Sequence, residues 1–472
     1  FLDAAMSSVE APPETTHFSD SDRSSPSSLL RVQPPSADAR DLQERAHATI
    51  PAGCHTYNKG DDQYPVLAPP VLARGHGCRV WDVDGNEYIE YGMGSRAVTL
   101  GHAFERVVDA AEAWMRKGSN FLRVAPIEVE YAEALIEQIG PADMVKFTKD
   151  GSTTTTAALK LARAYTGREK VAYCADHPFF SYDDWFIGFS EMNAGIPDSE
   201  TAGVAHFHYD DLDSVRRLFA EHPDEIACLI LEPAKYHHPT DNFLHEVRDL
   251  CHAHGALFVL DEMVTGFRLA IGGGQAYYDV EADLSTFGKA MGNGFAVSAL
   301  AGRREIMELG GLHHDQEKVF LLSTTHGAEY HALAAGLETL RIYQEEPVIE
   351  TLVQRGERLR DGVNQVAEAM GVRDAFGVMG MPSNLVFTTA GPDGTPSQDF
   401  RTLFMQEMVR RGILAPSFVV SYSHTKADID RTIEATAEAL VPYKRALNDG
   451  GVDGHLVGRP VQPVFRTYNG VV

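Results

Sequence analysis

Residues 256–294 read ALFVLDEMVTGFRLAIGGGQAYYDVEADLSTFGKAMGNG. The first eight residues form a nearly continuous apolar run ending in Asp261, Glu262 and Met263, which is typical of a strand buried on both faces of a parallel sheet. Ligands of open α/β sheets bind at the carboxyl ends of the strands. Asp261 is therefore either a turn residue or a carboxylate that holds the protonated ring nitrogen of a cofactor.

Lys289 lies near the end of the same stretch, in STFGKAMGNG (285–294). Most lysines are solvated surface residues. Here Gly288 precedes the lysine, and Gly292 and Gly294 follow it, so the backbone can approach a ligand closely. The setting makes Lys289 a candidate functional amine.

The chain around this stretch alternates between amphipathic helices and short apolar strands. We predict helices over 127–139, 153–166, 211–221 and 242–254, and strands over 144–149, 170–175, 226–233 and 256–263. Such alternation indicates an α/β fold with a mainly parallel central sheet covered by helices on both faces.

The flanking segments differ in composition from this central region. Residues 1–40 are rich in Ser, Pro, Asp and Glu and predict a disordered tail. Residues 41–100 form an N-terminal segment with a hairpin predicted at 78–91, around an Asp-Gly-Asn turn. Residues 101–330 form the large domain. Two long helices predicted at 330–344 and 348–370, followed by a mixed tail, suggest a smaller α+β domain over 331–472.

A candidate anion site lies at the start of the helix predicted over 153–166, in KDGSTTTT (149–156). Gly151 and Ser152 occupy the helix N-terminus, where free N–H groups and the helix dipole favour an anion. The same residues also suit an ordinary helix cap without a ligand. Taken in chain order, a phosphate turn, a strand-end aspartate and a lysine are the parts that a pyridoxal-phosphate (PLP) enzyme requires.

The stretch 261–294 closely resembles the segment that joins the ring-binding aspartate to the Schiff-base lysine in class III aminotransferases. Within that family it is most similar to glutamate-1-semialdehyde aminomutase. The resemblance extends over about residues 45–445 and includes GREKVAY (167–173), LILEP (229–233) and AGRREIM (301–307). It implies the fold type I of PLP-dependent transferases, with a large domain and a smaller α+β domain.

The resemblance assigns roles to particular residues. Lys289 would be the Schiff-base lysine and the proton shuttle, and Asp261 would pair with the pyridinium nitrogen. Gly151 and Ser152 match the phosphate-binding turn. The remaining matches are a ring-stacking residue (Phe179), a residue covering the opposite ring face (Met263), and a threonine that reaches the phosphate of the neighbouring subunit (Thr325). The last match implies a homodimer with a shared active site.

The sequence departs from the aminomutase pattern around the substrate. Ser-Gly-Thr-Glu is replaced by Asp150-Gly151-Ser152-Thr153. Lys59 lies nearest the position of a substrate-carboxylate arginine, and Arg96 stands where the aminomutase has an apolar or aromatic residue. Since lysine does not offer the bidentate fork of arginine, we expect a different substrate pocket, with Lys59 and Arg96 contacting an anionic or polyhydroxylated substrate.

Composition excludes several other classes of protein. The net charge of −26 argues against nucleic-acid binding or attachment to anionic lipid, and no apolar run is long enough to span a bilayer. Five widely spaced cysteines favour a reducing cytoplasm over a disulfide framework. The histidine pairs lack the partners of a metal site, so no metal is expected.

The leading interpretation is an aminotransferase that moves an amino group from an amine donor to an aldehyde or ketone acceptor, such as a sugar-like or natural-product intermediate. The alternatives are the intramolecular aminomutase reaction, epimerisation of an amino acid on the same cofactor, and a non-catalytic scaffold. A scaffold has no need of Lys289 or Asp261.

Overall fold

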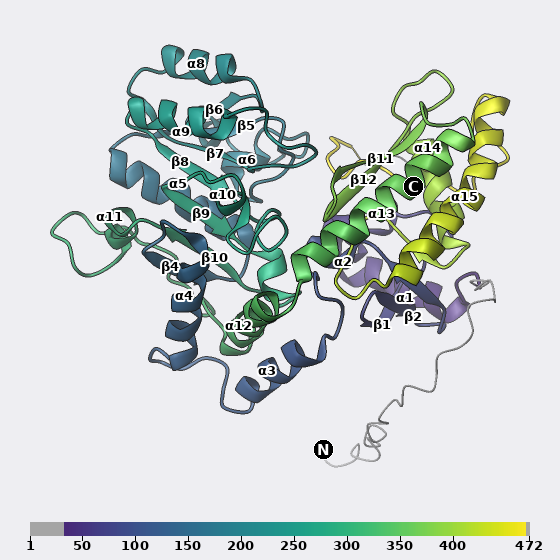
Figure 1. The fold of residues 1–472 in the computed structure, drawn as a ribbon, viewed down its shortest axis with the longest axis horizontal. Helices are drawn as coiled ribbons and strands as arrows, with labels where there is room; N and C mark the ends of the chain where they lie inside the picture. The colour runs from purple at the N-terminus through teal and green to yellow at the C-terminus, as the bar shows by residue number, and fades with distance from the viewer. Residues whose placement is uncertain (1–32, 469–472) are drawn as a thin grey trace, which may run out of the picture.

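A seven-stranded sheet forms the centre of the larger lobe in this computed structural model, which describes residues 33–468 (Figure 1). The strand order is β4-β10-β9-β8-β7-β5-β6. Neighbouring strands from β9 to β6 are parallel, and β10 is antiparallel to both β9 and β4. The strands are β4 (Met144–Thr148), β5 (Lys170–Cys174), β6 (Val204–Phe207), β7 (Ile226–Leu231), β8 (Leu257–Asp261), β9 (Leu284–Phe287) and β10 (Ser298–Gly302).

Helices cover both faces of this sheet. Helix α5 (Gly151–Thr166) shares one apolar cluster with the sheet, and α8 (Leu212–Glu221) and α9 (Phe243–Ala253) share another. Every residue of β7, β8 and β9 is buried, as expected for apolar strands enclosed on both sides. The predicted mainly parallel sheet is confirmed. Each predicted helix and strand corresponds to an observed element, and its two ends differ from the observed ends by at most two residues.

The N-terminal hairpin lies in the smaller lobe, beside the C-terminal half of the chain (Figure 1). Strands β1 (Leu72–His76), β2 (Arg79–Asp82) and β3 (Glu87–Glu90) are successively antiparallel, and β13 (Ile413–Leu414) joins β3 in parallel. The turn is closed by Asp82, whose Oδ1 accepts hydrogen bonds from the N–H groups of Asp84 and Asn86. The hairpin predicted at 78–91 is therefore confirmed.

The rest of the smaller lobe consists of long helices around a two-stranded hairpin. These elements are β11 (Phe376–Met381), β12 (Asn384–Thr389), α13 (Val348–Ala369), α14 (Gln398–Val409) and α15 (Lys426–Asp449). Helix α12 (Tyr330–Glu345) packs mainly against α3 (Glu105–Met115) and α4 (Pro126–Ile139), which belong to the larger lobe. We propose that the boundary between the lobes lies between α12 and α13.

The first described helix, α1 (Ala37–Thr49), begins inside the predicted 1–40 tail, because the Ser36 hydroxyl accepts a hydrogen bond from the N–H of Ala39. Residues 1–32 of that prediction lie outside the described residues. The short helices are α2 (Met93–Arg96), α6 (Asp184–Ile187), α7 (Ser199–Ala202), α10 (Gly273–Tyr277) and α11 (Arg304–Met307). Within residues 33–468, none of the helices has the length and apolar character needed to cross a membrane.

Candidate active site

Asp261 and Lys289 lie at the carboxyl edge of neighbouring parallel strands. Asp261 ends β8 opposite Thr286 of β9, and Lys289 follows β9 after Gly288. The Asp261 Oδ1 accepts hydrogen bonds from the N–H of Met263 and the hydroxyl of Thr286, both at 3.0 Å. Among the described residues no donor reaches Oδ2, which leaves that oxygen available to a ligand.

Burial changes the proton affinity of both groups. It lowers the pKa of the Lys289 amine to about 8, with Glu232 and Asp261 opposing the change. It raises the pKa of the Asp261 carboxyl to about 7, with Glu232 adding to the rise and Lys289 opposing it. A larger fraction of the lysine is therefore a neutral amine near pH 8 than in water, as a nucleophile or a base requires.

Met263 connects these residues to the start of α5. A Cβ added at Gly151 would lie 2.7 Å from the Met263 Sδ, and one added at Gly288 would lie 2.6 Å from the same atom. The backbone before Lys289 and the helix start therefore both approach the Met263 side chain closely. The structure thus brings together Asp261, Met263, Gly151 and Lys289, although only the first two are near in sequence.

Helix α5 begins at Gly151, two residues before the predicted start at 153, because Asp150 is its N-cap. The Asp150 carboxylate accepts a hydrogen bond from the Thr153 N–H at 2.8 Å. The N–H groups of Gly151 and Ser152 belong to the first turn and have no acceptor within the helix. The cap and the anion site, which the sequence left as alternatives, are thus compatible, because they use different N–H groups.

Phe179 and Thr325 lie on loops. Phe179 is exposed and packs edge-on against Phe186, with 5.8 Å between ring centroids. Thr325 is exposed, and its carbonyl accepts a hydrogen bond from the Asn120 side chain at 2.8 Å. Within the described chain, Thr325 makes no hydrogen bond or ion pair with Asp261 or Lys289.

Glu232 is a site residue that sequence reasoning did not single out. It follows β7, the strand next to β8, and its Oε1 accepts a hydrogen bond from the Lys235 amine at 2.6 Å. Burial acts to raise the pKa of Glu232, but Lys235 and His177 outweigh it, so the pKa is lowered. Its position in the sequence could have identified it. Like Asp261, Glu232 is a carboxylate at the carboxyl end of an apolar strand, in LILEP (229–233).

Arg96 is the last residue of a strained turn formed by residues 93–96. Met93, Gly94, Ser95 and Arg96 all have positive φ angles, of 42°, 58°, 58° and 75°. Left-handed backbone costs an L-residue roughly 1–2 kcal/mol, or roughly 3–6 kcal/mol for the three that are not glycine. The turn is held at its start, where the Met93 N–H donates to the Glu90 carboxylate, and at its end, where the Arg96 carbonyl accepts from the buried Arg268. Such strain is typical of functional loops.

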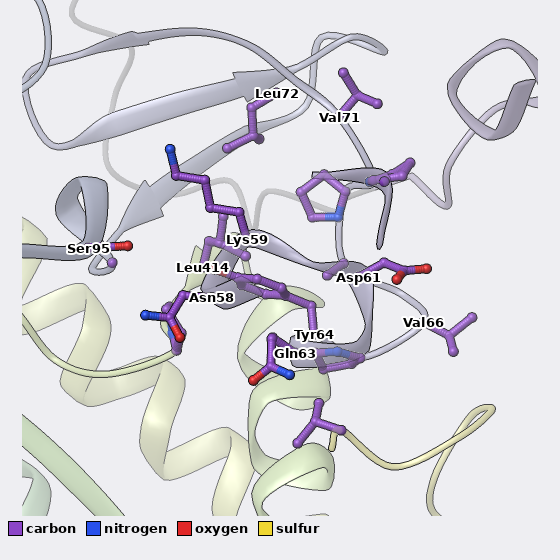
Figure 2. Close-up of a pocket in the computed structure, with 18 of the residues that line it drawn as sticks. Asn58, Lys59, Asp61, Gln63, Tyr64, Val66, Val71, Leu72, Ser95 and Leu414 are labelled. Atoms are coloured by element: carbon purple, nitrogen blue, oxygen red, sulfur yellow. The ribbon is translucent and has the colours of Figure 1, made fainter. Parts of the chain in front are cut away.

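A cavity of about 1290 Å³ adjoins this turn and exceeds the roughly 300–1,000 Å³ of most small-molecule sites. Both predicted substrate residues, Lys59 and Arg96, line it, as do Tyr64 and Arg401. Figure 2 shows Lys59 and Tyr64 in the same part of the lining, with Ser95 of the strained turn at its edge. Lys289 is not part of the lining. Arg96 links the two regions, because its charge contributes to lowering the pKa of Lys289.

The wall of the cavity comes from both ends of the chain. The C-terminal segment contributes Arg459 and Val461. It is fixed to α14, where the Val461 N–H donates to the Thr402 hydroxyl at 2.9 Å and the Val457 N–H donates to Gln406 at 2.8 Å. The N-terminal side contributes Lys59 and Tyr64. None of these wall contacts is local in sequence.

Comparison with known proteins agrees with this geometry. Residues 60–383 match the class III aminotransferase family. Over 85% of this chain and 97% of the relative, the chain is 33% identical to glutamate-1-semialdehyde 2,1-aminomutase of Desulforamulus reducens. It is 30% identical to 3-aminobutyryl-CoA aminotransferase of Cloacimonas acidaminovorans, over 87% of this chain and 98% of that protein.

Solved structures of PLP-dependent aminotransferases have the same fold as this chain. The PLP internal aldimine form of the FumI protein of Sphingopyxis superposes with a TM-score of 0.78 at 28% identity, covering 90% of this chain and 98% of that one. An omega-transaminase of Sphaerobacter thermophilus also gives a TM-score of 0.78, at 26% identity over 87% and 98% of the two chains. The fold and the site together define a PLP-dependent enzyme of fold type I. Within that class, the chain belongs to the class III aminotransferase family.

The site residues fit this cofactor. Asp261 Oδ2 is available to a ring N–H, and the start of α5 offers backbone donors for a phosphate. The Lys289 amine projects from a backbone with a φ of 47°, immediately after a glycine that leaves no room for a Cβ. Among residues 33–468 no cluster of three or more His, Cys, Asp or Glu is arranged to hold a metal ion.

Proposed function

We propose that this protein is an aminotransferase that takes an amino group from an amine donor and delivers it to a separate aldehyde or ketone, in two successive half-reactions at Lys289. The observation that carries the proposal is the large cavity beside Arg96, with Lys59 and Arg401 in its lining. Its size suits a substrate larger than a five-carbon semialdehyde, and its cations suit an anionic or polyhydroxylated one.

Lys289, Asp261 and the start of α5 would hold the cofactor. The Lys289 amine would attach it covalently, the Asp261 Oδ2 would accept the hydrogen bond of its ring nitrogen, and the N–H groups of Gly151 and Ser152 would bind its phosphate. Phe179 and Met263 would cover the two faces of the ring. When bound, PLP supplies an electron sink for the carbon that loses its proton.

The Lys289 Nζ, once released by an incoming amine, would take the proton from the substrate carbon that bears the nitrogen and return it to the cofactor carbon on the other side of that nitrogen. Its lowered pKa of about 8 leaves roughly a tenth of this amine neutral at pH 7, far more than for an ordinary lysine. Glu232 and Asp261 act in the opposite direction and stabilise the protonated amine while it holds the proton. Lys59 and Arg96 would orient the substrate from the cavity.

The aminomutase reaction is the second candidate. It is favoured by the identity of 33% to 35% with glutamate-1-semialdehyde 2,1-aminomutases of Desulforamulus reducens and Acetivibrio thermocellus. A mutase needs no external donor, because its single substrate carries both functional groups. Epimerisation would also proceed on a single substrate, but it would leave the amine on its original carbon.

We further propose a homodimer in the cytoplasm, in which Thr325 reaches the cofactor phosphate of the partner subunit. The loops around residues 120–124 and 312–325 meet through the hydrogen bond from Asn120 to Thr325. They expose large apolar side chains, including Leu122, Val124 and Phe320 at 101%, 71% and 70% exposure. Such a patch is typical of a surface covered by another subunit. Five free cysteines, four of them buried, suit a reducing compartment.

A nitrogen-labelling experiment separates the candidate reactions. The holoenzyme is incubated with a nitrogen-15-labelled amine donor and a panel of carbonyl acceptors, and separately with unlabelled glutamate-1-semialdehyde alone. We expect the label to appear in an acceptor and the semialdehyde to be turned over poorly. Rapid formation of 5-aminolevulinate without any donor would contradict the proposal and establish the mutase, and hydrogen exchange at the α carbon without loss of nitrogen would indicate an epimerase.

A further inference from the structure

Arg401, on the first turns of α14, is a cavity-lining cation without a carboxylate partner among the described residues. Its guanidinium lies 4.6 Å from the centre of the Phe387 ring and donates to the carbonyl of Pro416. No ion pair within 4.0 Å involves this side chain in residues 33–468. A guanidinium has five N–H donors, and within residues 33–468 the carbonyl of Pro416 is the one acceptor that those of Arg401 reach.

Arg96 also lines the cavity without a carboxylate partner among the described residues. Its backbone carbonyl accepts a hydrogen bond from Arg268 of the larger lobe. The Arg96 Nε donates to the Asn384 side-chain oxygen at 2.7 Å, which is a neutral amide. In the described part of the chain it makes no ion pair either. The strained turn of residues 93–96 thus positions a guanidinium whose charge is not balanced by a direct partner.

The two arginines face one cavity and affect each other electrostatically. Burial lowers the pKa of Arg401, and the charge of Arg96 lowers it further, although Tyr64 opposes the change. Two like charges that line one cavity and are partly desolvated favour an anion that interacts with both. Arg401 belongs to the smaller lobe and the turn of Arg96 contacts the larger one, so such an anion would bind where the lobes meet.

Glu90 is one of three carboxylates that also line the cavity, and among the described residues none of the three forms an ion pair with either arginine. The two oxygens of Glu90 accept the N–H of Met93 at 2.8 Å, and Oε2 also contacts the His102 Nε2 at 3.1 Å. Through the bond to the Met93 N–H, Glu90 stabilises the start of the strained turn. Within the described chain neither guanidinium is therefore in direct contact with a carboxylate, and both can accept one from a ligand.

We propose that Arg96 and Arg401 together bind one oxyanion of the substrate, a carboxylate or a phosphate, and that Arg401 determines substrate specificity. This inference rests on the proposed aminotransferase function and assigns its substrate a negative charge at a defined place. Arginine suits this role because its planar fork forms two parallel hydrogen bonds to a carboxylate or phosphate. Lys59, which is exposed, lies at a more solvated part of the lining.

The test measures binding of simple anions to the holoenzyme. Keeping PLP bound prevents the probes from occupying the helix start that would hold the cofactor phosphate. Titration calorimetry with glutarate, inorganic phosphate and acetate is carried out on the wild type, Arg401→Gln, Arg96→Gln and the double variant. Arg410→Gln is the matched control, because Arg410 lies at the end of the same helix, outside the cavity, and pairs with Glu407.

We expect glutarate or phosphate to bind the wild type and the control equally, and Arg401→Gln to raise Kd at least tenfold without changing the visible cofactor spectrum. The tighter of the two probes identifies the oxyanion as carboxylate or phosphate. Because both guanidiniums would hold one anion, the double variant should bind little more weakly than either single variant.

Three results would overturn the proposal: no binding of either probe by the wild type, unchanged binding by Arg401→Gln, or fully additive losses in the double variant, which would indicate two separate anions. Calorimetry measures anion binding whether or not nitrogen is transferred. A failure of the aminotransferase proposal would instead appear in the labelling experiment, so the two failures are distinguishable.

Discussion

The two halves that we propose for this site, a cofactor half and a substrate half, differ in how their charges are balanced. In the cofactor half, Lys289, Asp261 and Glu232 lie on adjacent strand ends and shift one another's pKa. In the substrate half, Arg96 and Arg401 come from distant parts of the chain and have no carboxylate partner among the described residues. The buried charges that are paired within the protein are those that we propose act in the reaction. The two guanidiniums that have no carboxylate partner among the described residues indicate instead that the substrate carries a negative charge.

The largest expected effect belongs to the cofactor half. Lys289→Ala would remove both the proposed covalent attachment and the proposed base, and loss of a positioned base alone costs roughly 10²–10⁴ in rate. We expect kcat to fall by at least that factor and the visible cofactor band to disappear. Lys318→Ala, at an exposed position, is the control and should behave as the wild type. Substantial turnover by the Lys289→Ala variant would show that another group carries the proton.

Asp261→Asn should have the next largest effect. The amide keeps an acceptor for Met263 and Thr286 but loses the charge that pairs with a protonated ring. Breaking a buried charge pair costs roughly 3–5 kcal/mol, so we expect kcat to fall by roughly 10²–10⁴ while the fold is retained. Circular dichroism checks the fold and steady-state kinetics checks the rate. An unchanged kcat would mean that Asp261 is only the turn residue that the sequence also allowed.

The lowered pKa of Lys289 makes the third prediction. Only the neutral amine attacks an aldehyde, so the rate at which the cofactor-free protein takes up PLP should rise about tenfold per pH unit and level off near pH 8. An unperturbed lysine would level off only near 10.5. Stopped-flow absorbance measures this profile.

The pH at which the rate of PLP uptake is half its maximum, the midpoint of this profile, should shift in opposite directions in a variant of each half of the site. Arg96→Gln removes a cation that lowers the pKa of Lys289, so the midpoint should rise. Glu232→Gln removes an anion that raises it, so the midpoint should fall. If Arg96→Gln did not raise the pH at which the rate levels off, the two halves would be electrostatically independent.

Much of the fold and of the cofactor half follows from local sequence. Apolar strands, amphipathic helices and a strand-end carboxylate are short-range patterns, so the sheet, Asp261 and the turn at Gly151 were all predictable. Arg401 was not, because a single arginine on an amphipathic helix is indistinguishable from a surface residue. Its meaning depends on Phe387, Pro416 and Arg96, which the fold brings together from separate elements. The strain at 93–96 was also hidden, since Met, Ser and Arg rarely adopt positive φ.

The smallest expected effect concerns the outer wall of the cavity. Thr402→Val removes the acceptor of the Val461 N–H, and an unsatisfied buried donor costs about 1–3 kcal/mol. We expect the segment after α15 to become more sensitive to proteolysis and the apparent substrate KM to rise a few-fold, with the cofactor spectrum unchanged. Thr351→Val loses a comparable hydroxyl bond to a backbone carbonyl on α13 and should leave the segment protected. Equal sensitivity of both variants would mean that Thr402 does not anchor the wall.

The central claim, that nitrogen leaves one molecule and enters another at Lys289, is tested most directly by the absorbance spectrum of the purified holoenzyme. The spectrum is recorded before and after a panel of amine donors that includes glutamate, and again after a carbonyl acceptor is added. We predict that at least one donor abolishes the visible band, that an acceptor restores it, and that Lys289→Ala, which should lack the band, does not gain it when donor and acceptor are added. A band that no donor alters, in an enzyme that converts glutamate-1-semialdehyde unaided, would contradict the central claim.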